Sequence, residues 1–136
     1  MYSGIELRPE FIDIWQSKLK TQIIKCSPEA ATLIDIENNN GELSEDIIVS
    51  LVDKIESKGY VDLIAQYYIA QLGAAMAHSI GHGYVTLNFL QYYISVRDCL
   101  NNSGYWIDVF NNDLTSNEAK ELILLRDILN ELNSYL

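Results

Sequence analysis

Residues 63–96 read LIAQYYIAQLGAAMAHSIGHGYVTLNFLQYYISV, and this segment decides the fold of the chain. It is a quarter of the protein, yet every Asp, Glu, Lys and Arg lies outside it. We predict two helices here, over about 62–80 and 84–100, joined by a tight turn at Gly81-His82-Gly83. A helix that is apolar around its whole circumference is usually enclosed by other helices. We therefore expect this hairpin to form the buried centre of a helical domain.

Two patterns inside this segment indicate how the hairpin packs. Small residues recur at intervals of three and four, which lets a neighbouring helix approach closely; they are Ala70, Gly73, Ala74, Ala77 and Gly81. Gly73 inside a helix costs about 1 kcal/mol relative to alanine, so we expect close packing to compensate for it. Tyrosine is doubled in each helix, at 67–68 and at 92–93, and an antiparallel hairpin brings the two pairs together.

The rest of the chain predicts further helices on both sides of the hairpin. We expect them over about 9–25, 28–37, 44–58 and 116–136, with a short helical turn at 105–110 whose Trp106 and Phe110 cover the core. Ser27, Ser44 and Ser116 are suitable capping residues, and no stretch alternates long enough to predict a strand. Residues 1–7 are expected to form an arm. The prediction is an all-α, single-domain bundle (1–136) of five to six helices around a buried central hairpin.

Composition and charge limit the functional classes. The net charge is −10, and no basic stripe is present, so direct binding to nucleic acid is not expected. Polar residues interrupt both central helices and no basic flank accompanies them, so no membrane span is expected. Cys26 and Cys99 are isolated, and no apolar leader is visible. We expect a cytoplasmic protein, and the richness in Ile, Asn and Lys suggests a bacterial one with an AT-biased genome.

Two motifs resemble metal sites in part. The turn at 38–44 resembles the middle of an EF-hand loop, but the alignment places Ile36 and Ile47 where calcium needs carboxylates. His78 and His82 are four residues apart, as in some zinc helices, but no third ligand is near them. We therefore expect no metal and no cofactor. No nucleophile–base pair or catalytic carboxylate pair stands out, so we do not expect an enzyme.

A candidate partner-binding surface lies on the helix predicted at 44–58. On the face opposite the apolar stripe, four acidic residues surround Val49; they are Glu45, Asp46, Asp53 and Glu56. Glu42 and Glu37 precede them in the adjoining turn and helix and complete the candidate set. The simpler interpretation is an ordinary solvated helix face. Our leading hypothesis is a small binding protein for a basic partner, such as an immunity or inhibitor protein for a toxin or nuclease. The alternatives are a structural or adaptor module that dimerises through the leucines of residues 122–136, and a ligand- or metal-binding protein that uses its tyrosines and histidines.

Overall fold

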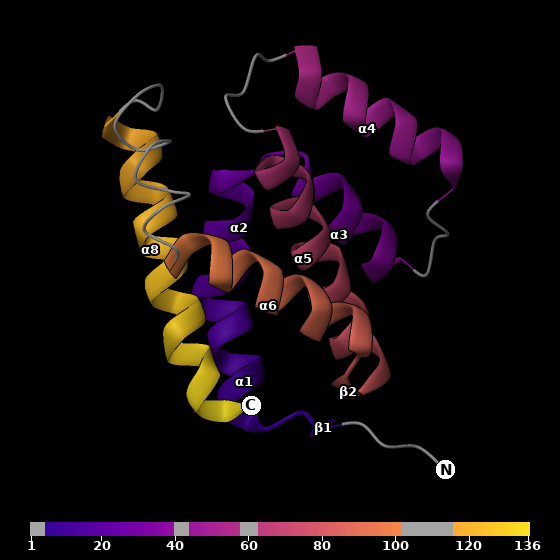
Figure 1. Cartoon of the computed structure of the whole chain (residues 1–136). Coiled ribbons are helices and arrows are strands. Elements are labelled where there is room, and N and C mark those ends of the chain that lie inside the picture. The colour runs from indigo at the N-terminus through magenta and orange to yellow at the C-terminus, as the bar shows by residue number, and fades with distance from the viewer. Residues whose placement is uncertain (1–4, 40–43, 58–62, 102–115) are drawn as a thin grey trace.

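The computed structural model describes residues 5–39, 44–57, 63–101 and 116–136. The described residues form an all-α bundle, which confirms the predicted fold class (Figure 1). In chain order the elements are β1 (Ile5–Glu6), α1 (Pro9–Ile14), a π-helical segment (Trp15–Leu19), α2 (Lys20–Cys26), α3 (Ala30–Asn38), α4 (Glu45–Ser57), α5 (Leu63–His82), β2 (Tyr84–Val85), α6 (Leu87–Asn101), α8 (Ser116–Leu132) and a 3-10 turn (Asn133–Tyr135).

Helix α5 is the centre of the bundle, as the charge-free segment predicts. Every residue from 69 to 77 is buried, and α5 contacts α2, α3, α4 and α6. Gly73 faces side chains of both α2 and α3. A Cβ atom at this position would lie 3.0 Å from Cγ2 of Ile23 and 3.2 Å from Cδ1 of Ile34. The close packing expected at Gly73 is therefore confirmed.

The connection between α5 and α6 differs from the predicted turn. Helix α5 continues through Gly81 to His82, and Gly83 then takes a positive φ of 79°. The Ser79 hydroxyl accepts a hydrogen bond from the N–H of Thr86 at 3.0 Å, which holds the connection against the helix end. Helix α6 starts at Leu87 because Tyr84 and Val85 pair with β1. This two-residue strand pair was not predicted, since its partners lie about 80 residues apart.

Burial is unequal in the two central helices. Helix α6 buries one face, which carries Phe89, Tyr93, Val96 and Leu100. Its other face is open, and Leu87 is 82% exposed. Helix α5 is therefore enclosed by other helices along much of its length, whereas α6 is an amphipathic covering helix.

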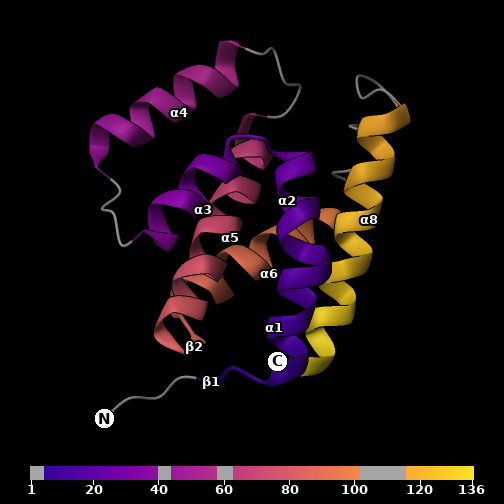
Figure 2. The ribbon, with the colours of Figure 1, turned by 180° about the vertical axis from the view of Figure 1, so that it is seen from behind.

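The helix predicted at 9–25 contains a π-helical segment between α1 and α2, and it lies beside α8 (Figures 1 and 2). The amide of buried Gln22 donates a 2.7 Å hydrogen bond to the backbone carbonyl of Glu121, which ties α2 to α8. The leucine seam of α8 is buried within this chain and comprises Leu122, Leu125, Leu129 and Leu132. These four leucines already have their partners, so they do not form an open seam for a second copy.

Of the predicted helix caps, the one at Ser44 is present and the one at Ser27 is not. The hydroxyl of Ser44 accepts the N–H of Ile47 at 3.3 Å, as expected for a cap. The expectation for Ser27 is wrong, because its hydroxyl donates to the backbone carbonyl of Gln66 in α5 and α3 starts only at Ala30. The helical turn predicted at 105–110, with Trp106 and Phe110, lies outside the described residues.

Candidate functional site

Helix α4 lies at one end of the molecule, beyond α3 and α5 (Figures 1 and 2). Among the side chains that the structure describes in this helix, Leu51 is buried and Ile47 is partly buried against the core. These two residues of the predicted apolar stripe contact the bundle. Most of its other described side chains face solvent.

The acidic face predicted on α4 is exposed where it is described. Glu45, Asp46 and Asp53 are exposed, and Val49 among them is 53% exposed. The predicted residue Glu42 and the side chain of Glu56 lie outside the described residues. The face therefore presents at least three carboxylates around one apolar side chain.

A groove of about 370 Å³ lies between α3 and α4 and borders this face. It is lined by Thr32 and Ile36 of α3 and by Asp46, Ile47, Ser50, Leu51 and Lys54 of α4. Ile36 and Ile47, the residues that exclude an EF-hand calcium site, thus form part of an apolar wall. Asp46 belongs to both the acidic face and the groove. Lys54 is the one basic residue of this lining, so the groove is not uniformly acidic.

Glu37, which we had grouped with the acidic residues of α4, faces α5 instead. Its Oε2 lies 3.1 Å from Nδ1 of His78, and its side chain is only 18% exposed. The ring of His78 lies edge-on to that of His82, with centroids 4.1 Å apart. His78 is thus a half-exposed residue paired with a carboxylate.

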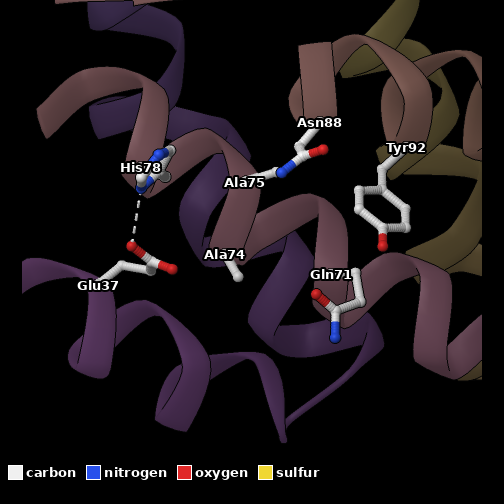
Figure 3. A pocket seen from close by; sticks show the side chains of 7 residues that line it. All are labelled: Glu37, Gln71, Ala74, Ala75, His78, Asn88 and Tyr92. Atoms are coloured by element: carbon white, nitrogen blue, oxygen red, sulfur yellow. Dashed lines mark hydrogen bonds and ion pairs between the residues drawn. The ribbon is translucent and has the colours of Figure 1, made fainter. Parts of the chain in front are cut away.

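A second pocket, of about 170 Å³, lies beside this pair (Figure 3). Seven residues of three helices line it: Glu37 of α3; Gln71, Ala74, Ala75 and His78 of α5; Asn88 and Tyr92 of α6. Figure 3 shows Glu37 and His78 on one side of the two alanines, with the other three polar residues on the opposite side. The pocket therefore has a small apolar floor between two polar ends.

Tyr92 connects the pocket to the doubled tyrosines. Its ring centroid lies 6.2 Å from that of Tyr68, so the two tyrosine pairs meet as predicted. Burial raises the pKa of Tyr92, and the neighbouring phenols Tyr67 and Tyr68 raise it further. Its hydroxyl is therefore neutral at physiological pH and able both to donate and to accept a hydrogen bond.

Sequence reasoning named His78 and the tyrosines as possible ligand residues, but it missed the pocket. Gln71 and Asn88 were read only as polar interruptions of apolar helices. The presence of these polar residues in apolar helices was the signal that could have indicated the pocket, because a polar residue on an enclosed helix needs a partner or a pocket.

Two negative findings apply to the described part of the chain. Within it, no three His, Cys, Asp or Glu side chains are grouped closely enough to hold a metal ion. Among these same residues, no helix has both the length and the apolar character needed to cross a membrane.

No protein-family model, curated protein or solved structure matches this chain. The functions considered for the α4 face and for the pocket therefore depend on the chemistry of their own residues.

Proposed function

We propose that the protein binds a basic protein partner through its α4 surface. By α4 surface we mean the acidic face of Glu45, Asp46, Val49 and Asp53 together with the α3–α4 groove. The observation that supports this is the adjacency of exposed carboxylates and an apolar groove on one helix. The simpler interpretation, an ordinary solvated helix face, explains the exposed carboxylates but does not explain the apolar groove beside them.

The chemistry of the surface favours an amphipathic basic segment. Its apolar side chains would enter the groove against Ile36, Ile47 and Leu51, and its lysines or arginines would lie on the carboxylates of Asp46 and Asp53. The net charge of −10 attracts a basic partner at long range and raises the rate of encounter. Lys54 adds selectivity, because it repels a partner whose basic side chains point into the groove itself.

The specific role we propose is that of an immunity or inhibitor protein. A toxin or nuclease that acts on nucleic acid carries a basic groove, and an acidic protein that covers this groove blocks it. This step is an analogy between roles and does not follow from the fold.

A defined peptide tests the surface. The probe is a fluorescently labelled amphipathic helix with lysines on one face and leucines on the other, compared with a version that has glutamates instead of lysines. We expect the lysine peptide to bind, and Asp46→Lys combined with Asp53→Lys to slow its association by about tenfold. The matched control is Glu6→Lys combined with Asp13→Lys, two exposed acidic residues. They belong to β1 and α1, and these elements lie at the opposite end of the molecule from α4 (Figure 1). The control makes the same change in net charge and should retain most of the rate.

Salt and one apolar substitution complete the test. The association rate should fall as salt rises, because the Debye length shortens from about 10 Å at 0.1 M to about 3 Å at 1 M. Val49→Asp should weaken binding by removing an apolar contact. Equal rates in the α4 double variant and in the control would show that binding follows net charge alone, and the proposed surface would be wrong.

The inhibitor role needs a natural partner, captured from the native host. A captured nuclease or toxin should lose activity when the wild-type protein binds it, and should keep activity with the α4 double variant. Inhibition that is identical for both proteins would leave α4 with no part in the complex.

A further inference from the structure

The pocket lined by Glu37, Gln71, Ala74, Ala75, His78, Asn88 and Tyr92 contains an amide, that of Gln71, without a partner among the described residues. Gln71 is only 9% exposed, and its side chain makes no hydrogen bond to any other described residue. Buried amides in folded proteins are nearly always hydrogen-bonded, to protein or to another molecule. The Gln71 amide is not one of the polar atoms that are fully buried without a partner, so it opens onto the pocket and is available to a guest.

Each polar side chain of the pocket other than His78 carries an oxygen atom that can accept a hydrogen bond. The Glu37 carboxylate is an acceptor only, so Nδ1 of His78 is the donor in their 3.1 Å contact. That contact uses Oε2 and leaves Oε1 of Glu37 for a guest. The amide oxygens of Gln71 and Asn88 and the hydroxyl oxygen of Tyr92 add acceptors from α5 and α6.

We propose that this pocket binds a guanidinium group. A guanidinium has five N–H donors in a plane and no acceptor, and it pairs well with a carboxylate such as Glu37. Its flat face suits the small floor of Ala74 and Ala75 and the ring of Tyr92. The acidic chain favours a cation and disfavours an anion.

Size and donor number favour guanidinium over a simple ammonium. A cavity of about 150 Å³ holds a molecule the size of benzene, so the volume of about 170 Å³ suits a guanidinium on a short alkyl stem. An ammonium is compact and has three donors, which would satisfy Glu37 but leave the acceptors on the far side of the alanine floor unpaired. The two polar ends in Figure 3 therefore require a longer cation with several donors.

The guanidinium has two possible sources, a free small molecule or an arginine side chain of another protein. The proposal stands on a pocket between α3, α5 and α6, which shares no lining residue with the α3–α4 groove. It is therefore tested separately from the binding of a basic partner at α4.

The test is an NMR titration of the ¹⁵N-labelled full chain, followed at the side-chain amide signals of Gln71 and Asn88. The probes are agmatine, its diamine analogue putrescine, and the blocked amino acid N-acetylarginine N-methylamide. We expect saturable shifts of both amides with agmatine, at an affinity about tenfold higher than with putrescine. Saturation by the blocked arginine as well would identify an arginine side chain as a source, whereas binding of agmatine alone would favour a free guanidino compound.

Two variants and one control locate the site. Glu37→Gln should weaken agmatine binding by about tenfold, because it removes the charge of the carboxylate. Asp35→Asn, on the same helix and exposed, makes the same charge change outside the pocket and should bind agmatine as the wild type does. Asn88→Ala removes an exposed lining residue, which leaves the core intact, and should also weaken binding.

Three results would overturn the proposal. The first is the absence of saturable shifts at the two amides with agmatine, which would mean that the pocket holds only water. The second is equal binding of putrescine and agmatine, which would remove the argument for guanidinium. The third is equal weakening by Glu37→Gln and Asp35→Asn, which would indicate attraction to the net charge without a site.

Discussion

The hydroxyl of Tyr93 in α6 donates a hydrogen bond to the backbone carbonyl of Leu129 in α8, at a distance of 3.0 Å. The same hydroxyl lies 3.1 Å from Oδ1 of Asn133. Tyr93 is buried, its ring stacks on Phe89, and burial raises its pKa, so it remains a neutral donor. This contact ties the charge-free segment to the last helix.

Tyr93→Phe tests the value of this hydrogen bond. The ring and its packing are kept, but the hydroxyl that donates to the carbonyl of Leu129 is removed. We expect the free energy of unfolding to fall by about 1 kcal/mol, measured by chemical denaturation. Tyr92→Phe is the control, because the Tyr92 hydroxyl makes no hydrogen bond with another described side chain or backbone group and its loss should cost less. Equal decreases in the free energy of unfolding for Tyr93→Phe and Tyr92→Phe would mean that the Tyr93 hydrogen bond makes no measurable contribution to stability.

The three glycines of the α5 region should respond differently to alanine. Gly81 is helical and exposed with open space around it, so Gly81→Ala should stabilise the protein by about 0.5–1 kcal/mol. Gly73→Ala should show no such gain, because its Cβ would lie 3.0 Å from Ile23. Gly83→Ala should be destabilising by about 1 kcal/mol, since φ is +79°. Thermal unfolding of the three variants checks the order, and a gain at position 73 equal to that at 81 would contradict the tight contact.

Substitutions at two alanines of α5 distinguish a core position from a pocket position. Ala77 is buried and lies outside the pocket lining, so Ala77→Leu should cost about 1–3 kcal/mol through overpacking. Ala74 is also buried but lines the pocket, so part of a larger side chain has space there. We expect Ala74→Leu to cost less and to block agmatine binding. Losses of equal size in both variants would show that the pocket cannot accept a leucine side chain.

The thiol of Cys26 should make stability depend on pH in the alkaline range. Burial raises its pKa from 9.0 to about 12. Between these values the unfolded chain has lost the thiol proton and the folded chain keeps it, so the free energy of unfolding falls as pH rises above about 9. At pH 10 the Cys26 thiol should lower the free energy of unfolding by about 1 kcal/mol.

Cys26→Ala is the matching variant for that measurement. Stability differences between wild type and variant, taken by denaturation at several pH values, isolate the thiol from other groups that titrate at high pH. The difference should be constant below pH 9 and should then change in favour of the variant. In the native wild type, Cys26 should also resist alkylation at pH 8, because the thiolate is the reactive form. Rapid alkylation of this residue in the folded protein would contradict its burial.

We expect no dependence of stability on divalent metal. The two isoleucines at the ends of the EF-hand-like turn and the absence of a three-ligand group in the described structure are the reasons. The melting temperature should be the same with and without a chelator. A chelator-sensitive melting temperature that zinc or calcium restores stoichiometrically would contradict this.

The sequence by itself determined the fold class and the centre of the bundle. Helical periodicity, capping residues and a long segment without charged residues are local properties, and they are visible without any knowledge of contacts. The same is true of the acidic face of α4, because residues at helical spacing share a face whatever the helix packs against. The close packing at Gly73 followed in the same way from the cost of glycine inside a helix.

Only the tertiary structure decided what meets across helices. Glu37 and His78 are 41 residues apart and β1 pairs with a strand about 80 residues away, so no local pattern specifies either contact. The hydroxyl of Ser27 reaches α5 instead of capping its own helix for the same reason. The pocket exists because α3, α5 and α6 place the polar residues of three separate segments around two small alanines. A site of this kind depends on the relative positions of whole helices, and these follow from the packing of the entire core.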